Sequence, residues 1–129
     1  MRIPRGILVL GLTVAVALSA GAALGANVVK IRSKVTIAAD GLRFHGKVLS
    51  PNAACEQGRK VKLKREVPGK DPVFGTSTTD AQGRWEVTVS GFAGVSLSRF
   101  YARVRRRSEG TAGTIFVCRS DRSRSIRPG

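Results

Sequence analysis

The sequence predicts an all-β fold, a single antiparallel β-sandwich of about seven strands. Apolar and polar residues alternate in most segments after residue 26, and turn-forming residues recur about every ten positions. No stretch keeps a helical period over three turns. Because alternation places successive side chains on opposite faces, each strand is expected to have one face in a core and one in water.

The first two strands are expected at 34–38 and 42–48, joined at Asp40 and Gly41, a pair typical of a tight turn. Phe44 is expected in the core, so its neighbour His45 should face solvent. A lone histidine on a solvent-facing strand position is most simply a surface residue. We therefore assign His45 no catalytic role from the sequence.

The clearest strand is 59–65, where Val61 and Leu63 share one face and three lysines share the other. Two prolines and a glycine at 68–72 then predict a loop. Further strands are expected at 73–79, 85–89, 100–104 and 116–118. Residues 120–129 are mainly serine and arginine with one isolated isoleucine, which predicts a disordered tail.

Residues 1–26 have the features of a secretory signal peptide: Arg2 and Arg5, an apolar run at 6–18, and small residues to Ala26. Cleavage is expected after 20–22 or after 23–25, and the sequence favours neither site. The alternative is an uncleaved anchor, because the apolar stretch approaches the ~20 residues that span a bilayer. In both cases the remainder is exported, so we expect a secreted domain at 27–119 and a basic tail at 120–129.

Cys55 and Cys118 are the only cysteines of a short exported chain, which favours a disulfide between them. Zinc would need about four ligands. The chain has one histidine and no Cys-x-x-Cys spacing, so no metal site is expected. No glycine-rich phosphate loop is present either, so we expect no cofactor.

The segment Thr78–Trp85 is the most informative motif. Asp80 can accept hydrogen bonds from the turn backbone, Gly83 can take a positive φ, and Trp85 begins the next strand pointing inward. This Thr-Asp-x-x-Gly-x-aromatic arrangement resembles the extracellular prealbumin-like β-sandwiches, namely carboxypeptidase regulatory-like, transthyretin-like and collagen-adhesin B-type domains. The resemblance extends to the strands at 46–48, 58–63 and 101–104 and covers residues 35–119.

The resemblance implies scaffolding, adhesion or display, with catalysis the exception. Two departures matter. Adhesin-type members can carry a Lys-to-Asn or Lys-to-Asp crosslink, but the only asparagines here are Asn27 and Asn52, neither in the closing strand. Transthyretin-like hydrolases need several histidines and a Tyr-Arg-Gly-Ser ending, both absent. The resemblance therefore supports neither the crosslink nor the hydrolase activity, and no nucleophile with a positioned base stands out elsewhere.

The remaining functional signal is charge, with 23 Lys and Arg against 8 Asp and Glu. The cations concentrate at 59–65, 103–107 and 119–127. If the first two groups share a sheet, they would attract anionic cell-wall polymer or lipid head groups of a bacterial envelope. The residues expected to bind are Lys60, Lys62, Lys64, Arg103 and Arg105.

Three other interpretations stay open. One is an exported hydrolase with an unrecognised site, which a deep polar pocket containing His45 and a carboxylate would support. Positive charge can simply keep a small secreted domain soluble. The domain can also be an accessory module that binds a protein partner through a sheet edge. Nucleic acid is not expected as a partner, because the chain is exported and lacks the aromatic platform that base stacking needs.

Overall fold

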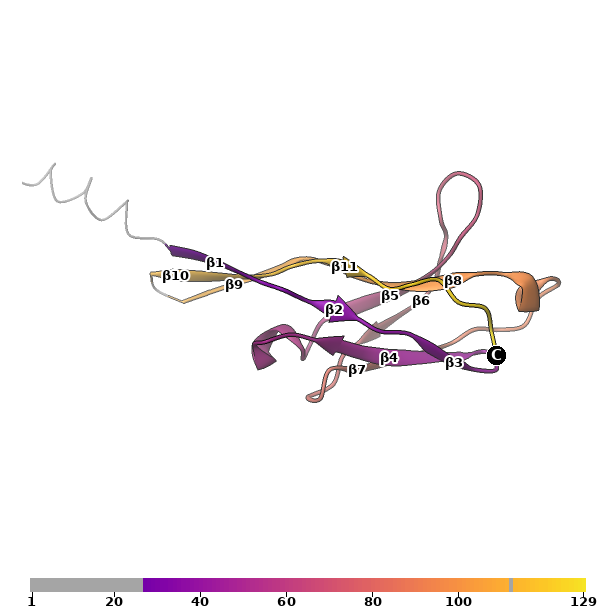
Figure 1. Cartoon of the computed structure of the whole chain (residues 1–129), viewed down its shortest axis with the longest axis horizontal. Helices are drawn as coiled ribbons and strands as arrows, with labels where there is room; N and C mark the ends of the chain where they lie inside the picture. Colours follow the sequence, from indigo (N-terminus) through magenta and orange to yellow (C-terminus); the bar gives the residue numbers. More distant parts are fainter. Residues whose placement is uncertain (1–26, 112) are drawn as a thin grey trace, which may run out of the picture.

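The computed structural model describes residues 27–111 and 113–129, which form eleven β-strands and two short 3-10 helices (Figure 1). The chain is all-β, as the alternating pattern predicted. The predicted signal peptide at 1–26 lies outside the described residues.

The sandwich consists of two four-stranded sheets. The first has the order β11-β8-β5-β6, with β5 at Lys60–Arg65, β6 at Val73–Thr78, β8 at Phe100–Val104 and β11 at Asp121–Arg122. In the second, β4 (Arg43–Leu49) is central. One edge of β4 pairs in succession with β2 (Lys34–Val35) and β3 (Ala38–Asp40), and the other edge pairs with β7 (Arg84–Thr88).

A third, three-stranded sheet extends from the sandwich, and we call it the arm. It consists of β1 (Asn27–Ile31), β10 (Thr114–Cys118) and β9 (Arg107–Thr111), in that order. The β9–β10 pair is antiparallel, whereas β1 runs parallel to β10. Figure 1 shows these strands together at the end of the molecule opposite β3 and the C-terminus.

The core lies between the two four-stranded sheets, because the inward face of each strand is apolar. Phe44 of β4 and Phe100 of β8 meet across it with ring centroids 4.8 Å apart. A Cβ at Gly75 would lie 2.3 Å from Val87 Cγ1, so glycine lets β6 approach β7 closely. The other fully or nearly buried core residues are Val35, Ile37, Val48, Val61, Leu63, Trp85, Val89, Ala102 and Val104.

The strand count differs from the prediction of about seven. The expected strand at 34–38 is divided into two strands, β2 and β3. They are interrupted at Thr36, where the side-chain oxygen accepts from the Lys47 amide while the Thr36 amide donates to the Lys47 carbonyl. Strands β1, β9 and β11 were not expected, since none has a clear alternation against the core. The parallel β1–β10 pair is also an exception to the expected antiparallel arrangement.

The structure also corrects the prediction of a disordered tail at 120–129. Asp121 accepts a hydrogen bond from the Val35 amide at 2.8 Å, and Ser123 Oγ accepts one from the Ala102 amide at 2.8 Å. Ile126 exchanges two backbone bonds with Phe100 and packs against the core. The segment is low in apolar residues, so its ordering depends on backbone pairing that composition does not reveal.

The predicted disulfide is confirmed: Cys55 and Cys118 are bonded, with Cα atoms 5.4 Å apart. Cys55 ends the 3-10 helix η1 (Ala53–Cys55), and Cys118 ends β10. Both are buried. The bond therefore attaches the base of the arm to the sandwich.

We predict that removing this disulfide destabilises the domain substantially. The two cysteines are 63 positions apart, and closing a loop of that length lowers unfolded-state entropy by an amount worth roughly 4 kcal/mol. The Cys55→Ala/Cys118→Ala variant should thus show a lower free energy of unfolding by about that amount in denaturant titrations followed by fluorescence of Trp85, the only tryptophan. Equal stability of the two proteins would contradict a stapling role.

Candidate anion-binding face

The two basic strands predicted from the sequence are neighbours. Strands β5 and β8 pair antiparallel, with Lys62 directly opposite Arg103. Directly opposed residues project to the same face of a sheet. Because Val61 and Leu63 are fully buried on the inner face, the alternating lysines of β5 project outward.

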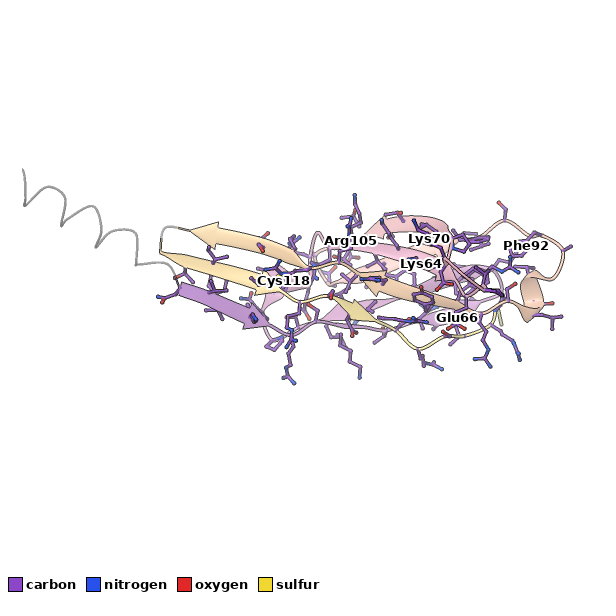
Figure 2. All side chains as sticks on the ribbon, turned by 90° about the horizontal axis from the view of Figure 1, so that it is seen from above. Lys64, Glu66, Lys70, Phe92, Arg105 and Cys118 are labelled. Carbon is purple, nitrogen blue, oxygen red and sulfur yellow. A yellow bond between two sulfur atoms is a disulfide. The ribbon has the colours of Figure 1, made fainter. Side chains whose placement is uncertain are left out.

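A third strand adds to this outer face. Strand β11 pairs with β8 so that Arg122 lies opposite Arg103. Arg122, Arg103 and Lys62 therefore form a row of cations across three adjacent strands. We call the outer surface formed by Lys60, Lys62, Lys64, Arg103, Arg105 and Arg122 the basic face; Lys64 and Arg105 are labelled in Figure 2.

One end of the basic face is hollowed. A shallow depression of about 460 Å³ lies where β5 begins and β8 leads into β9. None of the described residues that line it is acidic: they are Gly58, Arg59, Lys60, Arg103, Arg105, Arg106, Arg107 and Ser120. A depression walled by cations concentrates positive potential more than a flat surface does.

Most cations of the basic face have no acidic partner among the described residues. Of its six members only Arg122 forms an ion pair, with Glu66 at 3.0 Å. The other ion pairs of arginine lie at Arg43, Arg84 and Arg107. Within residues 27–111 and 113–129, the five residues predicted to bind anions therefore have no counter-charge within ion-pair distance.

Tyr101 closes the other end of the basic face. It is 3% exposed although it lies on the outer side of β8. Its hydroxyl donates to Asp71 Oδ2 at 2.6 Å, and the Arg122 guanidinium lies 3.8 Å from its ring centroid. Burial, with the Asp71 hydrogen bond, raises the pKa of Tyr101, and the same bond lowers the pKa of Asp71. Tyr101 thus holds the 66–72 loop through Asp71 and positions the Arg122 side chain over its ring.

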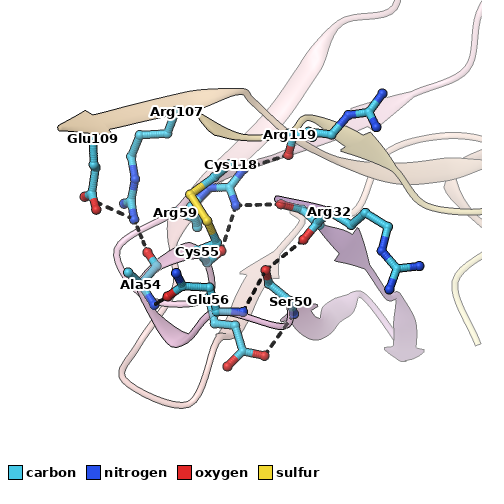
Figure 3. The surroundings of a disulfide bond; sticks show 12 residues. Arg32, Ser50, Ala54, Cys55, Glu56, Arg59, Arg107, Glu109, Cys118 and Arg119 are labelled. Carbon is cyan, nitrogen blue, oxygen red and sulfur yellow. Dashed lines mark hydrogen bonds and ion pairs between the residues drawn. A yellow bond between two sulfur atoms is a disulfide. The ribbon is translucent and has the colours of Figure 1, made fainter. Parts of the chain in front are cut away.

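Arg59 departs from the prediction that the whole 59–65 cluster is surface charge. It is only 1% exposed, beneath the hollow and beside the disulfide (Figure 3). Its Nη1 donates to Cys55 O at 2.7 Å and Ser33 Oγ at 2.9 Å, and its Nη2 donates to Arg105 O at 2.8 Å and Arg119 O at 3.1 Å. Burial lowers its pKa. Its position directly before Lys60 gave no signal of this structural role.

The Asp80 turn has a structural geometry. Asp80 Oδ1 accepts from the Gln82 and Arg84 amides, each at 2.9 Å, and the Arg84 amide is the main cause of the lowered pKa of Asp80. Gly83 has a φ of 78°, in the left-handed region that favours glycine. Trp85 is buried and donates from Nε1 to Thr36 O at 3.1 Å. These residues position β7 against the core.

A second depression, of about 560 Å³, contains His45, Ser77 and Glu86. His45 Nε2 lies 3.2 Å from Asp40 Oδ2, while Ser77 Oγ accepts from the Glu86 amide at 3.2 Å. The hydrogen bond of the Ser77 hydroxyl thus leads to a backbone amide rather than to the imidazole of His45. No group of three or more metal-ligating His, Cys, Asp or Glu side chains occurs within residues 27–111 and 113–129.

We predict that Arg59→Met lowers the free energy of unfolding by about 3 kcal/mol, because buried carbonyls lose a charged donor. The exposed neighbour Arg106 supplies the control, since Arg106→Met should change stability by less than about 0.5 kcal/mol. Both variants lose one charge near the hollow. Chemical denaturation measures the difference, and equal effects would contradict a structural role for Arg59.

We also predict that the single tyrosine titrates above its ordinary pKa of 10.0. Because the pKa is raised in the folded state, neutral Tyr101 contributes to the free energy of unfolding below pH 10.0. That contribution is lost as pH rises through the raised pKa. For Asp71 the sign is opposite: its contribution is present above pH 3.8 and lost as pH falls through the lowered pKa.

The measurement is the ultraviolet absorbance of tyrosinate as a function of pH. Asp71→Asn should move the midpoint down towards 10.0, because the anion that disfavours tyrosinate is gone. Asp40→Asn, at an exposed turn, should leave the midpoint unchanged. An unshifted midpoint in the Asp71 variant would show that the hydrogen bond does not hold in solution.

No protein-family model and no curated protein matches this chain. Within its described residues, the protein forms no helix with the length and apolar character needed to cross a bilayer. The conclusion for this site therefore depends on its geometry: an all-β domain with a disulfide and one strongly basic sheet face.

Proposed function

We propose that this protein is an exported, non-enzymatic β-sandwich domain of the prealbumin-like kind that binds anionic material of a bacterial cell envelope, either wall polymer or lipid head groups, through the basic face. The observation that carries the proposal is the register of β5, β8 and β11. It sets Lys62, Arg103 and Arg122 side by side. The disulfide fits an oxidising compartment outside the cytoplasm.

The spacing of the cations suits a ligand with repeated negative charges. Neighbouring strands lie about 4.8 Å apart, and alternate residues of one strand lie about 6.8 Å apart. The basic face is therefore a small grid of positive charges, with Lys60, Lys62 and Lys64 along one line. A polymer or bilayer surface can contact several of these cations at once and release its counterions, which makes binding multivalent and sensitive to salt.

The hollow beside Arg105 gives one anionic group a more enclosed position. Lys60, Arg103 and Arg105 surround it, and the described lining residues include no carboxylate that would repel an anion. Arg59 lies beneath it, but its Nη1 and Nη2 groups donate to backbone carbonyls and to Ser33. It therefore holds the residues around the hollow in place and is not expected to bind the anion. Arginine suits this position because its planar donors match phosphate and carboxylate.

We predict that Lys62→Gln/Arg103→Gln weakens binding to anionic vesicles and to anionic wall polymer by about tenfold or more at low salt. The matched control is Lys34→Gln/Lys47→Gln, which removes the same charge from the other sheet of the sandwich. Cosedimentation at low and high salt measures retention. Neutral vesicles provide the baseline.

Retention on anionic surfaces that falls with added salt, and that falls further in the first variant than in the control, supports the proposal. Equal losses in both variants would mean that net charge alone attracts the protein. Equal retention on anionic and neutral surfaces would refute the binding claim. Salt-insensitive capture of one protein would instead favour the alternative function, a partner bound at a sheet edge.

A further inference from the structure

The arm has a face that its own strands leave uncovered. The register of β1, β10 and β9 places Val28 beside Ile115 and Gly110, and Lys30 beside Val117 and Ser108. We call this set of six residues the arm face. Val28 is 58% exposed and Ile115 is 37% exposed, whereas Val117, nearer the disulfide, is buried. The outer part of the arm face is thus a pair of adjacent exposed aliphatic side chains.

The charges of the arm are divided between its two faces. The arm face carries one cation, Lys30, and no acid. Glu109 pairs with Phe116, so its side chain projects to the other face of the arm. There it forms an ion pair with Arg107 at 3.4 Å. An apolar pair next to a cation, without a carboxylate, matches the interfacial region of an anionic bilayer, where acyl chains lie below negative head groups.

The position of the arm in the chain points to the same occupant. The first described residue, Asn27, begins β1 opposite Thr114, at the end of the arm farthest from the disulfide. Eight residues, 19–26, separate it from the apolar run at 6–18. The sequence predicts that this run enters a membrane as a signal peptide or an anchor, and such a segment would bring this end of the arm near the bilayer surface.

We propose that the arm face contacts an anionic lipid bilayer, with Val28 and Ile115 entering the interfacial region and Lys30 at the head groups. This proposal deepens the proposed function, because it names lipid rather than wall polymer as the material that the arm contacts. It rests on that function, since the basic face is what attracts the protein to negative head groups. A second copy of the chain is a poorer occupant, because each copy carries a net charge of +15 and the arm face offers no acid to a partner's cations.

Tryptophan scanning of the exported protein tests the contact. Ile115→Trp places the probe on the arm face, and Val29→Trp places it on the opposite face at a site 43% exposed. The native Trp85 is 2% exposed in the sandwich core and gives a constant background. Vesicles of phosphatidylglycerol and phosphatidylcholine with brominated acyl chains quench only tryptophan that reaches the lipid.

We expect quenching of the Ile115→Trp variant by anionic vesicles and none of the Val29→Trp variant. Equal quenching of both, or quenching of neither by vesicles that retain the protein, would overturn the arm contact. If neither tryptophan is quenched although the vesicles retain the protein, the proposed function would stand, because the basic face would account for the retention. A concentration-dependent dimer in sedimentation, with the Ile115→Trp emission shifted without lipid, would assign the arm face to a second copy instead.

A second measurement uses variants that preserve strand propensity. Val28→Thr/Ile115→Thr should lower the fraction that stays on anionic vesicles at high salt by about tenfold, since the apolar contact is insensitive to screening. Val29→Thr is the control and should leave that fraction unchanged. Both should bind soluble dextran sulfate like the wild type. Dextran sulfate binding by the Lys62→Gln/Arg103→Gln variant tests the basic face separately, and it should be lost. The two proposals can therefore fail independently.

Discussion

The junction that joins the arm to the sandwich depends on the guanidinium of Arg59. The chain passes between sandwich and arm three times: after β1, between β8 and β9, and after β10. Arg59 contacts all three passages, through Ser33 Oγ, the Arg105 carbonyl and the Arg119 carbonyl, and it also bonds the carbonyl of Cys55. The disulfide from Cys55 to Cys118 lies beside it. Because a buried cation is costly unless its donors are satisfied, these bonds constrain the junction to one arrangement.

This junction links the two surfaces to which we assign binding. The Arg105 carbonyl is held from below, while the Arg105 side chain lines the hollow at the end of the basic face. The same contacts hold the base of β9 and β10, where Arg107 Nη1 also donates to the Gly58 carbonyl at 2.8 Å. The arm therefore has a fixed attachment to the sandwich. A rigid attachment fixes the orientation of the arm face relative to the basic face, so neither surface has to be ordered when it meets a ligand.

Sequence patterns gave different amounts of information in different parts of the chain. Strands β4, β5, β7 and β8 each alternate one residue in and one out against a shared core, so their positions and the outward lysines of β5 were predictable. The anion-binding candidates on β5 and β8 followed from the same alternation. Arg122 was grouped with a disordered tail, because two residues of backbone pairing leave no pattern in composition. Arg59 was grouped with the surface lysines, because burial of a charged side chain depends on acceptors 4 to 60 positions away.

By itself the sequence determined the all-β class, the single disulfide, the Asp80 turn and an excess of positive charge, since each of these follows from local residue order or from composition. Tertiary structure alone decided which strands are neighbours, and so turned separate basic segments into one face. It also ordered residues 121–126 and placed Glu109 on the face of the arm opposite Val28 and Ile115. The physical reason is that strand pairing uses backbone hydrogen bonds common to all residues, so the register that brings distant side chains together is fixed only when the whole core assembles.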